Sequence, residues 1–206
     1  MINEIISTVL QILVFALIPF IVYLITRRKI AGFFDYIGLK APEQKTVWLA
    51  AAASLVFLTG GITLVFLSDE MRHVLLNPPS ITGKLREMGL SGVSIATLLI
   101  IACFKTSLSE EILFRGFIAK RLVARLGFQT GNLVQAAIFA SVHLLLFWAL
   151  SKAGIGFLIF IFFFSGLAGY MVEYINEKVG NGSIIPGWIA HGLGNALSYS
   201  ILAFAV

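Results

Sequence analysis

A small set of polar side chains interrupts a chain that is otherwise mostly apolar. A charged side chain at membrane depth is costly, so residues of this kind are functional candidates by default. Hydrolysis of a peptide bond needs a base, a group that holds the attacking water and donors for the charge on the carbonyl oxygen. Carboxylates, imidazoles and an amide suited to these tasks occur in separate clusters: Glu110, Glu111 and Arg115; His143; and His191 with Asn195.

The spacing of the first cluster separates the roles of its carboxylates. On a helix, Glu111 and Arg115 are four residues apart on one face, with the acid N-terminal to the base, which is the better order for an ion pair. Glu110 is rotated by about 100° from Glu111, so it cannot share that partner equally well. We therefore expect one carboxylate to be paired and one to be free as the base, with Glu110 as the candidate and Glu111 as its alternative.

The other clusters supply the remaining tasks of the site. Phe139 and His143 are four residues apart, so the aromatic ring can pack against the imidazole and fix it. His143 is expected to hold the water together with Glu110 and to move a proton. His191 and Asn195 share one helical face and can donate to the oxyanion, while the glycines between them allow close approach of a backbone or a substrate.

The same residues permit other interpretations. Glu110, His143 and His191 would make a zinc site with two histidines and one carboxylate. Against zinc, the sequence contains no His-Glu-x-x-His, the ligands come from separate helices and Asn195 has no role, so we favour a site without a cofactor. Alternatively, the polar clusters hold helices together in a non-catalytic immunity or scaffold protein. A proton-coupled carrier is a further possibility, but the sequence shows no repeated halves.

The composition places the protein in a membrane. Of 206 residues, 59% are hydrophobic and 12% are charged, whereas soluble domains carry about 25% charged residues. The net charge of +5 comes from cations in short loops, which indicates membrane topology and contact with lipid, not binding of nucleic acid. The single cysteine, Cys103, excludes a disulfide framework.

Long apolar runs predict an all-α fold, a polytopic transmembrane helical bundle of about six to eight membrane segments. As one helix, residues 93–126 would be about 50 Å long, longer than a bilayer is thick, so we expect a break at residues 106–109. Residues 113–126 would then lie on the cytoplasmic surface. Residues 1–92 would form N-terminal membrane helices with amphipathic connectors, and residues 93–206 a catalytic core. The predicted runs are residues 5–25, 47–67, 93–126, 129–150, 155–175 and 184–206.

Cations gather in alternate connections between these runs, for example at Arg27-Arg28-Lys29 and Lys120-Arg121. Cytoplasmic loops carry an excess of Lys and Arg, so this end of the bundle is expected in the cytoplasm. The short chain favours a bacterial source, which places it in the inner membrane. The sequence does not indicate an oligomeric state.

Taken together and in this order, the three clusters resemble the CPBP family of CAAX-protease and bacteriocin-processing intramembrane proteases, also called the Abi family. The family includes the type II CAAX prenyl endopeptidase, and the resemblance covers residues 109–195. It implies a helical CAAX-protease-like core with a cavity open to the cytoplasm, and hydrolysis of a membrane-associated, prenylated or lipidated peptide by a glutamate-activated water. Members have also been described as metalloproteases. By motif, Glu110 and His143 would activate water, His191 and Asn195 would form the oxyanion site, and Glu111 and Arg115 would support them.

Overall fold

The computed structural model describes residues 1–150 and 153–206, and in these ranges the chain forms α- and π-helices joined by short turns. The predicted all-α fold is confirmed. The elements are α1 (Ile2–Arg27), α2 (Phe33–Tyr36), α3 (Gln44–Leu67), α4 (Asp69–Leu76), α5 (Ile81–Met88), α6 (Gly92–Leu99), η1 (Ile100–Leu108), η2 (Glu111–Ala119), α7 (Lys120–Leu126), α8 (Phe128–Leu150), α9 (Ile155–Tyr174), η3 (Ile175–Val179) and α10 (Ile185–Phe204), where η denotes a π-helical segment.

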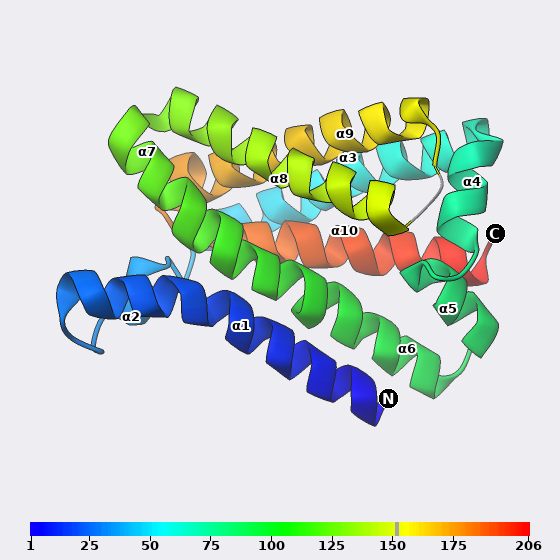
Figure 1. Cartoon of the computed structure of the whole chain (residues 1–206), viewed down its shortest axis with the longest axis horizontal. Coiled ribbons are helices and arrows are strands. Elements are labelled where there is room, and N and C mark those ends of the chain that lie inside the picture. Colours follow the sequence, from blue (N-terminus) through cyan, green and yellow to red (C-terminus); the bar gives the residue numbers. More distant parts are fainter. Residues whose placement is uncertain (151–152) are drawn as a thin grey trace.

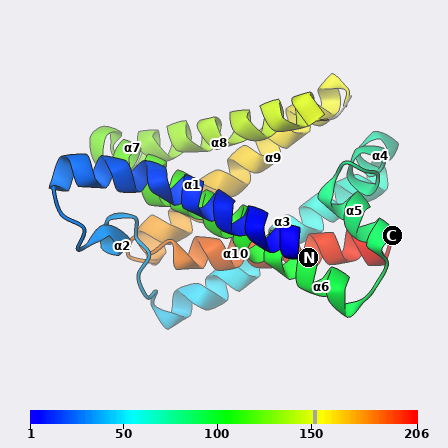
Figure 2. The same cartoon turned by 60° about the horizontal axis from the view of Figure 1, so that its bottom comes forward.

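The long helices run alternately in opposite directions (Figures 1 and 2). α10 is central and contacts α3, α9 and η1. α2 and α7 lie at one end of the bundle, while both termini and the short helices α4 and α5 lie toward the other. This order brings α10 and α8 beside the helix that carries the carboxylates.

Five helices in the described ranges are long and apolar enough to cross a membrane: Ile2–Arg27, Gln44–Leu67, Gly92–Leu126, Phe128–Ala149 and Ile155–Val179. α10 is 20 residues long, and such a helix is about 30 Å in length. It is more polar than the five because it carries Pro186, His191, Asn195 and several glycines. Two of the residues that lower the hydropathy of α10, His191 and Asn195, are also its candidate site residues.

The expected break at residues 106–109 is wrong, because one helix continues through 35 residues from Gly92 to Leu126. The hydroxyl groups in this stretch donate back into the helix. Ser107 Oγ lies 2.6 Å from the carbonyl oxygen of Ala102, and Thr106 Oγ1 lies 3.0 Å from that of Ile101. We refer to Gly92–Leu126 as the long helix. It contains η1 and η2, and the wider turns of η1 accommodate these bonds.

The surface helix expected at residues 113–126 is also wrong in its first half. Phe114, Arg115 and Gly116 are buried in the bundle, and the buried part extends to Ala119. By contrast, α7 has no buried residue. The motif residues therefore lie in the protein interior, and the chain reaches the surface only beyond them.

Polar contacts attach α1 to the long helix beside the carboxylates. Gln11 Nε2 donates to the carbonyl oxygen of Lys105 at 2.7 Å and to Ser109 Oγ at 3.1 Å. Lys105 also forms an ion pair with Glu4 near the start of α1. Because Ser109 directly precedes Glu110, these bonds fix the backbone at the point where the site begins.

Candidate active site

Glu110 lies between the two π-helical segments of the long helix, and its carboxylate meets two imidazoles. Glu110 Oε2 is 3.9 Å from Nε2 of His143, on α8, and 3.9 Å from Nε2 of His191, on α10. This oxygen is buried and has no hydrogen-bond partner in the described part of the chain. Helices distant in sequence thus direct two imidazole nitrogens at one carboxylate oxygen.

The backbone of α8 fixes the orientation of His143. Its Nδ1 lies 2.9 Å from the carbonyl oxygen of Phe139. A carbonyl oxygen can only accept, so Nδ1 carries the proton in this bond. In the neutral ring, Nε2 is then free to accept a hydrogen bond on the side that faces Glu110. The ring of Phe139 packs against the imidazole, with centroids 4.2 Å apart.

Glu111, in contrast, is fully buried and has several partners. Its Oε1 lies 3.5 Å from Nε of Arg115 and 3.4 Å from Nδ1 of His191. Its Oε2 accepts from Nδ2 of Asn176 at 3.4 Å. The two carboxylates therefore differ in the way their spacing suggests: Glu111 has partners that fix it in place, while one oxygen of Glu110 faces the imidazoles without a hydrogen bond.

The ring of Phe139 joins the components of this cluster. The guanidinium of Arg115 lies 4.0 Å above its centroid, a cation–π geometry. The rings of Phe114 and His191 meet it edge-on at 5.0 Å and 6.4 Å between centroids. One aromatic side chain thus contacts both imidazoles and the partner of Glu111.

Asn195 lies one turn beyond His191 on α10. Its Nδ2 donates to Thr106 Oγ1 at 3.2 Å and to Ser107 Oγ at 3.3 Å. The structure brings Glu110, Glu111, Arg115, His143 and His191 into one contact network and places Asn195 beside it, bonded to hydroxyl groups of the long helix.

The sequence analysis did not identify the residues of η3 and α10 that pack against the carboxylate of Glu111. Asn176, in η3, is fully buried, and its Oδ1 accepts from the backbone N–H of Gly187 at 2.7 Å. A Cβ atom on Gly187 would lie 2.5 Å from Glu111 Oε2 and 2.6 Å from Asn176 Nδ2. The available signal is an amide side chain one residue beyond the predicted apolar run of residues 155–175.

In the zinc-dependent alternative, the ligands would be Glu110, His143 and His191. Imidazole and carboxylate groups are chemically suitable, with bonds of about 2.0–2.2 Å, so two ligands of a tetrahedral ion are about 3.4 Å apart. The separations from Glu110 to His143 and His191 are both 3.9 Å. In the described residues no group of three or more histidine, cysteine, aspartate or glutamate side chains is arranged to hold a metal ion. As placed, these side chains do not form a zinc site.

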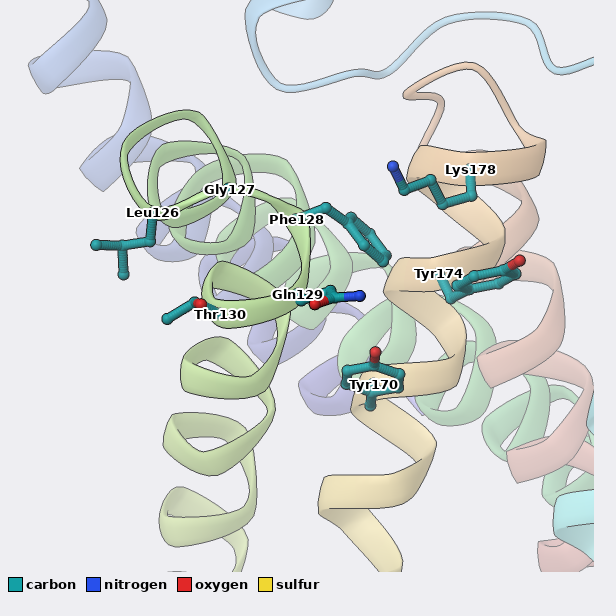
Figure 3. Close-up of a pocket in the computed structure, with 8 residues that line it drawn as sticks. All are labelled: Leu126, Gly127, Phe128, Gln129, Thr130, Tyr170, Tyr174 and Lys178. Atoms are coloured by element: carbon teal, nitrogen blue, oxygen red, sulfur yellow. The ribbon is translucent and has the colours of Figure 1, made fainter.

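A hollow of about 530 Å³ lies elsewhere, between the start of α8 and the end of α9. Figure 3 shows the ring of Phe128 between these helices and the side chain of Lys178 extending toward it, and the Nζ atom lies 4.4 Å from the ring centroid. None of the candidate site residues lines it. Its lining residues are Leu126, Gly127, Phe128, Gln129, Thr130, Tyr170, Tyr174 and Lys178.

A family model described as type II CAAX prenyl endopeptidase Rce1-like matches residues 92–197. The match begins at the first residue of the long helix and ends within α10, so it contains every candidate site residue. A search of curated proteins and a search of solved structures both gave no match. With its apolar spanning helices, the chain is a membrane protein of the CAAX-protease type. It belongs to the Rce1-like family of type II CAAX prenyl endopeptidases, and the predicted resemblance is confirmed.

Proposed function

We propose that this protein is an intramembrane endopeptidase in which Glu110 and His143 activate a water molecule for attack on a peptide bond. The observation that carries the proposal is the convergence of His143 Nε2 and His191 Nε2 on Glu110 Oε2, each at 3.9 Å. Separations of this size suit one shared water. A water oxygen about 2.8 Å from both a carboxylate oxygen and an imidazole nitrogen makes ordinary hydrogen bonds with the two at an angle of about 90°.

The reaction follows from the acceptors and donors around that position. The water donates one hydrogen to Glu110 and the other to Nε2 of His143, which directs a lone pair at the carbonyl carbon. As the new C–O bond forms, Glu110 takes the proton, and the carbonyl oxygen becomes an oxyanion. When the C–N bond breaks, Glu110 returns the proton to the leaving nitrogen. The products are an amine and a carboxylic acid, which loses its remaining proton to become a carboxylate, and no acyl-enzyme is needed.

His191 and Asn195 are the proposed donors to the oxyanion. A protonated His191 can keep its Nδ1–H on Glu111 and donate from Nε2. Asn195 can redirect one amide hydrogen from the hydroxyls of Thr106 and Ser107. Preorganised donors of this kind stabilise the charge that develops in the transition state. Glu111 and Arg115 act as positioning residues, because they hold His191 and the long helix without contacting the substrate.

The substrate class comes from the family, and the lipid setting from the apolar helices. We propose a membrane-associated peptide, with a prenylated C-terminal Cys-a-a-X sequence as the first candidate. The test uses the purified protein in liposomes with such a peptide and with the same peptide lacking the prenyl group. Mass spectrometry should detect the shortened, prenylated product and little cleavage of the unmodified peptide. No cleavage of either peptide would contradict the proposal.

We further propose that the protein lies in a cell membrane, that of a bacterium, with the site open to the cytoplasm. Arg27 and Arg28 end α1, and Lys120 and Arg121 lie in α7, at the end of the bundle opposite the termini. The excess of cations marks the cytoplasmic end. A reporter fused to the C-terminus should therefore be active outside the cytoplasm, and activity in the cytoplasm would reverse this orientation.

A further inference from the structure

The carboxyl group of Glu173 has no task in the proposed mechanism, yet it is buried inside a helix that can span the membrane. The side chain has no exposed surface, although its neighbours Tyr170 and Tyr174 on α9 line the hollow at the surface (Figure 3). Neither carboxylate oxygen has a hydrogen-bond partner among the described residues. Burial of a charge is costly unless the charge is paired and hydrogen-bonded.

The charged groups around Glu173 include fewer cations than carboxylates. Glu177 from η3, and Lys120, Arg115 and Glu111 from the long helix, interact with it electrostatically. Both cations already face a carboxylate: Lys120 Nζ lies 2.5 Å from Glu177 Oε1, and Arg115 Nε lies 3.5 Å from Glu111 Oε1. Glu173 is therefore a third carboxylate beside two cations, and it can be neutralised only by a proton or by sharing a cation.

Arg115 is the cation with bonding capacity to share. Its Nε and Nη1 atoms are buried without a hydrogen-bond partner in the structure as described. Its Nη2 atom lies against α9 at Gly169, where a Cβ atom would be only 3.3 Å away. Gly169 is one turn before Glu173 on the same helix. On this side α8 contributes Gln135, an uncharged residue that donates to the carbonyl oxygen of Gly169 at 3.1 Å.

We propose that Glu173 is a positioning residue that acts on the site through Arg115. When ionised, Glu173 competes with Glu111 for the guanidinium; when protonated, it leaves the guanidinium to Glu111. Glu111 also contacts Nδ1 of His191, so the charge on Glu173 sets how firmly that imidazole is held. The inference rests on the proposed function and gives the peptidase a pH dependence that originates outside the reacting groups.

The test compares kcat of Glu173→Gln with that of the wild type across pH. Glutamine has nearly the same shape but cannot ionise, so Arg115 stays with Glu111 throughout. The ratio of kcat for Glu173→Gln to kcat for the wild type should rise with pH, by about fivefold or more over the range in which both proteins stay folded, a typical coupling between linked sites. A group with a merely structural role would change kcat by the same factor at every pH. A constant ratio would therefore overturn the proposal.

Glu87→Gln is the matched control, because Glu87 is exposed on α5 and remote from the site. The ratio of kcat for Glu87→Gln to kcat for the wild type should stay constant with pH. If Glu173→Gln does not fold, Glu173→Met provides a second uncharged side chain of similar length. Loss of the fold in both variants would show that the carboxyl group is structural and would also overturn the proposal.

A second measurement separates this inference from the proposed function. If the wild type cleaves no peptide, the proposed function fails, but Tm can still be measured in the same buffers. A buried carboxyl group that must keep its proton or ionise at a cost destabilises the folded protein as pH rises. The Tm of the wild type should then fall relative to that of Glu173→Gln with increasing pH. A constant difference in Tm would contradict the inference independently of activity.

Discussion

Nε2 of His143 lies 3.9 Å from Oε2 of Glu110, although the two residues belong to different helices. The other nitrogen of the imidazole is bonded to the backbone of α8, and the carboxylate oxygen has no hydrogen bond from the described residues. The two facing atoms are both acceptors when the imidazole is neutral and the carboxylate is ionised. Two acceptors at this separation are suited to a donor shared between them, which is the role assigned to the water.

Removal of the two neighbouring carboxylates should have different effects on stability. Glu111→Gln leaves Arg115 buried without its carboxylate, and breaking a buried pair costs about 3–5 kcal/mol. Glu110→Gln breaks no ion pair with Lys or Arg, so its effect on the free energy of unfolding should be below about 1 kcal/mol. Unfolding in detergent, monitored by fluorescence, measures the free energy of unfolding of both variants. Equal losses would contradict the assignment of Glu111 as the paired carboxylate.

Asn195 should affect the transition state more than substrate binding. Loss of one donor to an oxyanion lowers kcat by about 10²–10³-fold, so Asn195→Ala should lower kcat by this factor with little change in KM. Thr106→Val removes one of the two hydroxyl groups that accept from the amide in the resting structure and should retain most of the activity. Steady-state kinetics with the prenylated peptide distinguish the two variants. An inactive Thr106→Val with an active Asn195→Ala would reverse their roles.

Gly187 should not tolerate a side chain, because the site for a Cβ atom is already filled. Gly187→Ala would place a methyl group 2.5 Å from Glu111 Oε2 and should destabilise the protein by about 1–3 kcal/mol. Gly194→Ala is the matched control on the same helix, since its Cβ atom would meet nothing closer than 3.9 Å. Thermal unfolding of the two variants checks the prediction. A Gly187→Ala variant as stable as the wild type would show that stability does not require the close packing of Gly187 against Glu111.

A chelator should not abolish activity. The separations of 3.9 Å from Glu110 to His143 and to His191 suit a shared water better than a common metal ion. We therefore expect the same kcat after dialysis against EDTA as before. Loss of cleavage on chelation, with recovery on addition of zinc, would favour the zinc-dependent alternative.

Much of the fold was predictable because membrane spans depend on local hydropathy. The runs predicted at residues 5–25, 47–67 and 129–150 lie inside α1, α3 and α8, and the run at residues 155–175 lies inside the continuous helix Ile155–Val179 formed by α9 and η3. The ion pair between Glu111 and Arg115 was predictable for the same reason, since helical spacing alone determines which side chains can meet.

Features that depend on packing between distant helices were not predictable in this way. The long helix continues through Ser107 because the hydroxyl bonds back to Ala102, whereas the same residue could equally have capped a new helix. The bond from Gly187 to Asn176 and the burial of Glu173 become visible only when α9, η3 and α10 are placed together. The polar residues of the bundle interior were therefore harder to predict than its apolar surface.

The most direct test of the proposed mechanism is the single-turnover rate of cleavage of the prenylated peptide by Glu110→Gln in liposomes. Glutamine keeps the shape of the side chain but cannot take a proton from water, and general-base catalysis contributes about 10²–10⁴-fold. We predict a loss of rate in this range with an unchanged Tm, while Glu87→Gln cleaves as fast as the wild type. Cleavage by a folded Glu110→Gln at the wild-type rate would contradict the account.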